Sequence, residues 1–139
     1  MLYPKEVIEK TSAWIEDDAY AKQWLQQNNF EELVQLKDAV SRHAKAFEYL
    51  LVNKYLVLAA FVNAVWDDKK AFQLLMEKKA FVWAAMANYI NGDDDAATFL
   101  HKNNLKHYAD LAHKIQAKIR REGDEGTNFF GSGPFKKEL

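Results

Sequence analysis

The chain has 139 residues, of which 49% are hydrophobic and 28% are charged, and its formal net charge at pH 7 is −1. This size and composition predict a single folded domain and exclude a wholly disordered chain. The near-zero charge provides no general attraction to nucleic acid or membranes. Without cysteine, the chain can form neither disulfides nor thiolate metal sites.

The N-terminal residues lack the apolar stretch of a secretory signal. The uncharged segment 55–66 is too short to span a bilayer. We therefore expect a cytoplasmic protein that does not associate with membranes.

The first predicted element is a single helix over residues 4–17, which we interpret as half of a repeat. Ile8 precedes Leu33 by 25 residues, and the same step recurs through the rest of the domain. Other positions of this segment, such as Thr11 and Ser12, are more polar than their counterparts in the middle of the chain. A terminal unit must present one side to water, so the half repeat is expected to act as a cap.

Four full repeats follow, over residues 21–45, 46–70, 71–95 and 96–120. In each repeat, two short helices are expected to bury their apolar sides against the neighbouring repeats. The pattern that indicates this is a set of apolar columns stepped by 25 residues. The columns are Leu25, Leu50, Leu75 and Leu100; Leu33, Leu58, Trp83 and Tyr108; Leu36, Phe61, Met86 and Leu111; and Val40, Val65, Ile90 and Ile115.

Polar pairs separate the two helices of each repeat, at residues 28–29, 53–54, 78–79 and 103–104. Asn tolerates the left-handed conformation that ends a helix, so the Asn-Asn pairs at 28–29 and 103–104 fit a tight turn well. The Lys-Lys pair at 78–79 fits it less well.

Aspartates stand between the repeats. Asp18, Asp68 and Asp93 can each accept hydrogen bonds from the free amides that open the next helix. His43 stands in the same register and lacks the carboxylate.

These elements predict an all-α fold over residues 1–122. We expect a short right-handed α-α superhelix of about four 25-residue helical-hairpin repeats with an N-terminal half repeat. Residues 21–115 resemble the helical-hairpin repeat proteins of the HEAT, tetratricopeptide and ankyrin kinds. The T-P-L-H-x-A and W-x-x-L-G signatures are missing, so no functional residue is carried over. The resemblance implies only that such an array binds partners on a concave face.

One polar column persists through the apolar helices, at Asp38, Asn63, Asn88 and His113. A row of Asn can grip an extended peptide backbone, because its side chain offers both a donor and an acceptor. This is similar in outline to the asparagine row of armadillo proteins. The alternative is that the column faces solvent or bonds a neighbouring helix.

The last helix carries two further candidates. His107, Asp110 and His113 could hold zinc or act in acid-base chemistry, although the two histidines are splayed around the helix and a solvated face is the alternative. A run of cations could contact phosphate backbones, or could simply suit the helix dipole. These cations are Lys102, Lys106, Lys114, Lys118, Arg120 and Arg121.

Residues 123–139 form a tail rich in glycine and phenylalanine. Phe129, Phe130 and Phe135 are too apolar for an inert end. Either they fold back to seal the last repeat, or they are a motif that docks into a partner or into a second copy of the chain.

The function predicted from the sequence is a protein- or peptide-binding interaction module. The alternative is a nucleic-acid-binding protein that uses the basic last helix. Catalytic and phosphate-loop signatures are missing from the sequence, so we expect no enzyme activity, cofactor or metal. The identity of the partner and the oligomeric state are left open.

Overall fold

The computed structural model describes residues 2–124, and between these residues the chain forms nine helices and no strand. The predicted tail anchors Phe129, Phe130 and Phe135 lie outside the described residues. The helices are α1 (Lys5–Ile15), α2 (Ala19–Gln27), α3 (Glu31–Val40), α4 (Ala44–Val52), α5 (Leu56–Val65), α6 (Lys69–Glu77), α7 (Phe81–Ile90), α8 (Asp94–Lys102) and α9 (Lys106–Asp124). The all-α prediction is confirmed.

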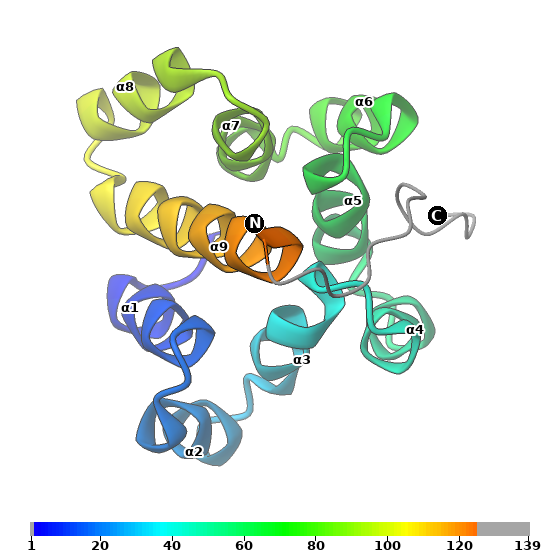
Figure 1. Ribbon diagram of the computed structural model, residues 1–139, viewed down its shortest axis with the longest axis vertical. Helices are drawn as coiled ribbons and strands as arrows, with labels where there is room; N and C mark the ends of the chain where they lie inside the picture. Colours follow the sequence, from blue (N-terminus) through cyan, green and yellow to red (C-terminus); the bar gives the residue numbers. More distant parts are fainter. Residues whose placement is uncertain (1, 125–139) are drawn as a thin grey trace.

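The helices form two layers (Figure 1). The odd-numbered helices α1, α3, α5, α7 and α9 gather in the middle, and the shorter α2, α4, α6 and α8 lie around them. Each odd-numbered helix packs against the next one in the series, and α1 also packs against α9. The two ends of the helical array therefore meet.

The helix bounds recur with the step seen in the sequence. The outer helices begin at Ala19, Ala44, Lys69 and Asp94, each 25 residues after the one before. The inner helices α3, α5, α7 and α9 begin at Glu31, Leu56, Phe81 and Lys106 with the same step. Helical units of 25 residues are thus present, while a right-handed superhelix stays a prediction.

Residues in the left-handed conformation follow the helices, both in the turns within each repeat and in the turns between repeats. Asn29, Lys54, Lys79 and Asn104 have positive φ in the turns within the repeats, and Asp17, Arg42, Asp67 and Gly92 have it in the turns between them. After Asn29, for example, the N–H of Phe30 donates to the carbonyl of Leu25 at 2.8 Å. This bond satisfies a carbonyl that the helix end would leave free. The prediction of tight turns is confirmed, also at Lys79.

The predicted helix caps are confirmed as well. The side chains of Asp18 and Asp68 each accept two backbone N–H bonds, and Asp93 accepts one. His43 occupies the same position at the start of α4 and makes no side-chain cap bond.

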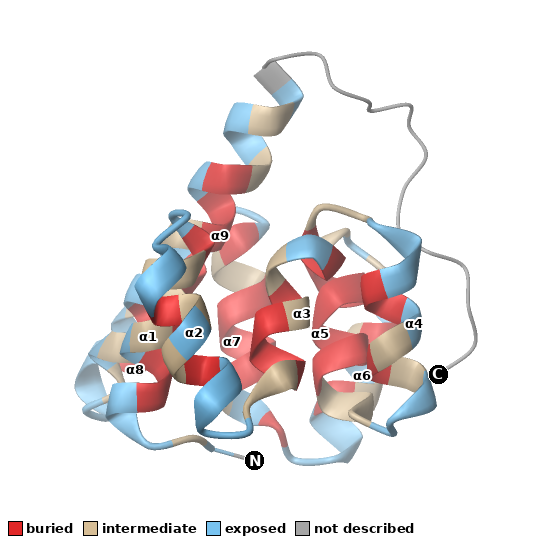
Figure 2. Ribbon diagram, turned by 90° about the horizontal axis from the view of Figure 1, so that it is seen from below, coloured by how far each residue is buried: buried red, intermediate tan, exposed pale blue. Residues whose placement is uncertain are grey.

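The apolar columns form the core, and Figure 2 shows buried residues concentrated on the inner helices. Leu25, Leu50, Leu75 and Leu100 are all fully buried. So are Trp83 and Tyr108, whose ring centroids lie 5.7 Å apart. The prediction that the residues of these columns are buried is confirmed, while their arrangement in successive layers of a superhelix stays a prediction.

The expectation that residues 4–17 form a cap facing water stays a prediction, because Glu9 is exposed whereas Thr11 is fully buried. Helix α1 packs against α2, α3 and α9, and the hydroxyl of Thr11 donates to the carbonyl of Val7 at 2.8 Å. A hydroxyl that donates to a carbonyl of its own helix keeps a hydrogen bond when it is buried. Glu9 and Ser12 of α1 line a hollow together with residues of α9, which is distant in sequence.

The sequence analysis missed a row of side-chain donors. The indole N–H of Trp66 donates to the carbonyl of Val40 at 3.0 Å, and the amide of Asn91 donates to Ala64 at 2.9 Å. Gln116 reaches the carbonyls of Tyr89 and Ile90. These residues are 25 apart, and each satisfies a carbonyl near the end of the preceding inner helix.

Candidate binding groove between the first and last helices

Two adjoining hollows of about 370 and 480 Å³ lie along the junction of α1 and α9. Both are lined by Glu9, His107 and Asp110, and we call them together the seam groove. Its other lining residues are Lys5, Ser12, His101, Asn104, Lys106, His113 and Lys114. All of these side chains are polar or charged.

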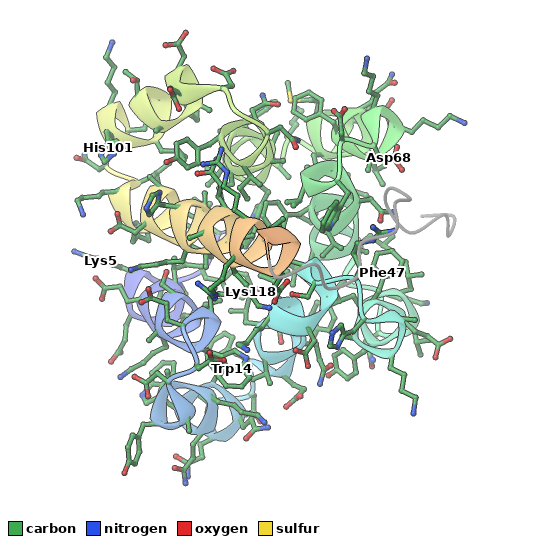
Figure 3. The ribbon with its side chains drawn as sticks, viewed as in Figure 1. Lys5, Trp14, Phe47, Asp68, His101 and Lys118 are labelled. Carbon is green, nitrogen blue, oxygen red and sulfur yellow. The ribbon has the colours of Figure 1, made fainter. Side chains whose placement is uncertain are left out.

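Helical spacing brings the lining residues together. Lys5, Glu9 and Ser12 are four and three residues apart, which places them on one face of α1. Asp110 and His113 are three residues apart, and both lie on the face of α9 that borders the hollow of about 370 Å³. His101 comes from the end of α8, and Figure 3 shows it and Lys5 on the same side of the molecule, flanking α9.

Ion pairs neutralise most of the fixed charges. The Lys106 ammonium lies 3.0 Å from the Asp110 carboxylate, and the Lys114 ammonium lies 3.0 Å from the Glu16 carboxylate. The second pair links α9 to Glu16, the residue that directly follows α1. All four side chains are substantially exposed, so each pair adds little stability.

The histidines of the groove have different surroundings. Nδ1 of His113 lies 3.1 Å from the hydroxyl of Tyr89. His107 is half-buried, and its pKa is lowered by burial and by the positive charge of Lys5, against the opposing effect of Glu9 and Asp110. His107 is therefore held neutral more firmly than an exposed histidine.

Ser12 lines the groove, but its hydroxyl is shielded from solvent. Its Oγ is buried and has no hydrogen-bond partner among the described residues.

The predicted trio His107, Asp110 and His113 does meet in one groove. Among residues 2–124, however, no three His, Asp or Glu side chains are placed so that they could hold a metal ion. An acid-base role for the trio is only an alternative to a solvated face, and it stays untested.

The predicted polar column does not form one accessible row. Asp38 and His113 are exposed, Asn88 is half-buried and Asn63 is 1% exposed. The side-chain oxygen of Asn63 is buried and has no hydrogen-bond partner in the described part of the chain. Only His113 lines the seam groove, and peptide binding by the column stays a prediction.

Three lysines of α9 form ion pairs. Lys106 and Lys114 pair as described above, and Lys118 pairs with Glu122. Arg120 and Arg121 are exposed near the end of α9, which projects from the body of the molecule (Figure 2). Phosphate binding by this helix stays a prediction.

The sequence analysis treated Lys118 as a surface cation, but it is 6% exposed. Its ammonium contacts the hydroxyl of Ser41 and the carboxylate of Glu122. Ser41 directly follows α3, and Glu122 belongs to α9. We therefore interpret the cluster as a tie between α3 and α9. The Lys118–Glu122 spacing of four residues was the available signal.

No known protein provides a guide to the role of the groove. No protein-family model, curated protein or solved structure matches this chain. No described helix combines the length and apolar character that crossing a membrane requires.

Proposed function

We propose that this protein is a non-catalytic interaction module that binds a protein or peptide segment in the seam groove. The observation that supports this is the groove itself, two adjoining hollows lined by polar side chains of α1 and α9, His101 of α8 and Asn104 of the α8–α9 turn. Hollows of this size are in the range of ligand sites. Their donors and acceptors match the peptide backbone and polar side chains.

The proposal moves the binding site away from the column predicted from the sequence. Asp38, Asn63 and Asn88 contribute nothing to the seam groove, and His113 is the member that the two sites share. We retain the cytoplasmic location, and we retain the right-handed superhelix of four repeats as the description of the array. Self-association of the chain is a further expectation that the groove does not require.

Nucleic-acid binding has less support. The described lining residues of the groove include no Phe, Tyr or Trp on which a base could stack.

Selection from a random peptide library on the full chain tests the proposal. The selected peptides should shift the amide resonances of His107, Asp110 and Ser12 in NMR spectra. Charge reversal in the groove, Glu9→Lys with Lys114→Glu, should weaken their binding at least about tenfold. The matched control, Glu77→Lys with Lys45→Glu on the exposed surfaces of α6 and α4, should leave it unchanged.

Two results would contradict the proposal. One is a library that yields no binder to the folded protein. The other is a set of binders whose resonance shifts lie outside α1, α8 and α9 and whose affinity is unaffected by charge reversal in the groove.

A further inference from the structure

Three of the chain's four histidines line the seam groove. His101 comes from α8, and His107 and His113 come from α9. The fourth, His43, stands at the start of α4, and α4 lies across the molecule from α1 and α8 (Figure 1). Histidine is the side chain whose charge ordinarily changes between pH 5 and 8.

The fixed charges around these histidines cancel. The lysines are Lys5 from α1 and Lys106 and Lys114 from α9. The carboxylates are Glu9 from α1, Asp110 from α9 and Glu16, the partner of Lys114 at the end of α1. Three positive charges thus face three negative charges.

The other groups near the histidines are hydroxyls and an amide. Helix α7 contributes the Tyr89 hydroxyl, which contacts His113. Ser12 and Asn104 complete the lining and do not titrate. The net charge of the groove is therefore controlled by its histidines: it is near zero when they are neutral and strongly positive when they are protonated.

We propose that the seam groove binds a carboxylate-rich segment of a partner protein, and that it binds this segment more tightly as the pH falls and the three histidines become protonated. This inference rests on the proposed function. Protonated imidazoles donate charge-assisted hydrogen bonds to carboxylates, and neutral ones lack that charge.

Binding and protonation reinforce each other. A bound carboxylate lowers the free energy of the protonated histidines, so the complex takes up protons that the free protein leaves in solution. His107 should show this effect most strongly, because burial and Lys5 lower its pKa in the free protein. A carboxylate beside it offsets both influences.

Fluorescence anisotropy with the full chain tests the inference. The probe is a labelled peptide of about twelve residues in which glutamate alternates with glycine, and glutamate stays largely ionised at about pH 5.5. Three proteins are compared at about pH 7.5 and pH 5.5. They are the wild type, the triple variant His101→Gln/His107→Gln/His113→Gln, and the matched control His43→Gln.

We expect the affinity of the wild type and of His43→Gln to rise at least about tenfold between the two pH values. The triple variant should show less than about a threefold rise. An affinity that does not change with pH, or a triple variant that behaves like the wild type, would overturn the inference. Circular dichroism of each variant reports whether the fold is retained. If the triple variant unfolds, the test uses His101→Gln and His113→Gln singly, because both side chains are exposed.

Two further probes separate this inference from the proposed function. A lysine-glycine peptide that binds in the groove, when the glutamate peptide does not, would overturn the preference for carboxylates and leave the proposed function intact. A single-stranded oligonucleotide that binds more tightly than the glutamate peptide, with the same dependence on the three histidines, would overturn the assignment to a protein partner. If the random peptide library also yields no binder, the proposed function fails too.

Discussion

The backbone N–H of Tyr3 donates a hydrogen bond to the phenolic oxygen of Tyr108, 2.7 Å away and 105 residues later in the chain. The hydroxyl of Tyr3 in turn donates to the carboxylate of Glu32 at 3.0 Å. Glu32 is a buried residue of α3, and Tyr108 is a buried residue of α9. These bonds join the N-terminal segment to two inner helices, and they accompany the packing of α1 against α9 that creates the seam groove.

Replacing Tyr108 by Phe tests this junction. Tyr108→Phe keeps the buried ring and removes the acceptor of the Tyr3 N–H, so the free energy of unfolding should fall by about 1–2 kcal/mol in urea denaturation. Tyr20→Phe is the control, because Tyr20 is 84% exposed and should be insensitive to the change. Equal unfolding midpoints for both variants and the wild type would show that the Tyr3–Tyr108 bond does not stabilise the fold.

The helix caps offer a paired prediction. His43 has φ −81 and ψ 117, close to the φ −82 and ψ 110 of Asp68, so its backbone is already in the capping conformation. His43→Asp should therefore stabilise the protein by up to about 1 kcal/mol, and Asp68→Ala should destabilise it by about 1 kcal/mol. Thermal denaturation measures both changes. The idea fails if His43→Asp lowers the melting temperature.

The loss of stability should differ between substitutions of the two residues in the Lys118–Glu122 ion pair of α9. Glu122→Gln removes the carboxylate that contacts the buried Lys118 ammonium and should destabilise the protein by on the order of 1–2 kcal/mol, since Glu122 is itself partly exposed and Asp17 also interacts with Lys118. Lys118→Met removes the buried charge and should cost less than about 1 kcal/mol. Urea denaturation of the two variants provides the comparison. A larger loss for Lys118→Met than for Glu122→Gln would contradict this account of the cluster.

The pH dependence of stability should include a contribution from His107. Its folded-state pKa lies below the ordinary value of 6.5, so the unfolded chain binds a proton more readily. Stability conferred by neutral His107 is therefore complete above pH 6.5 and is lost as the pH falls below that value. His107→Gln should reduce the loss of stability between neutral and acidic pH, whereas His43→Gln should not. Urea midpoints at several pH values measure the slope, and identical slopes for the wild type and His107→Gln would exclude the effect.

The regular part of this fold was predictable because it is repeated. The columns that contain Leu25 and Trp83 mark buried positions, since every layer must hide the same face from water. Asp68 and Asn29 could be placed in a cap and a turn, because capping and left-handed conformations have strong residue preferences.

The junction of α1 and α9 was not predictable in the same way. A repeat reports contacts between neighbouring units, whereas α1 packs against α9 from the other end of the chain. The seam groove also breaks the period, because Lys5, Glu9 and His101 come together only when the ends of the array meet. Tyr108 was the available signal: it is the one member of its column with a hydroxyl, and a buried hydroxyl requires a partner.

The central claim is that the first and last helices of this chain pack together and form one groove between them. Nuclear Overhauser measurements on the full chain test it most directly. Contacts from the Tyr3 amide proton to the Tyr108 ring, and from residues of α1 to residues of α9, are the predicted result. A spectrum that shows contacts between successive repeats but none between residues 3–15 and 106–119 would contradict the account.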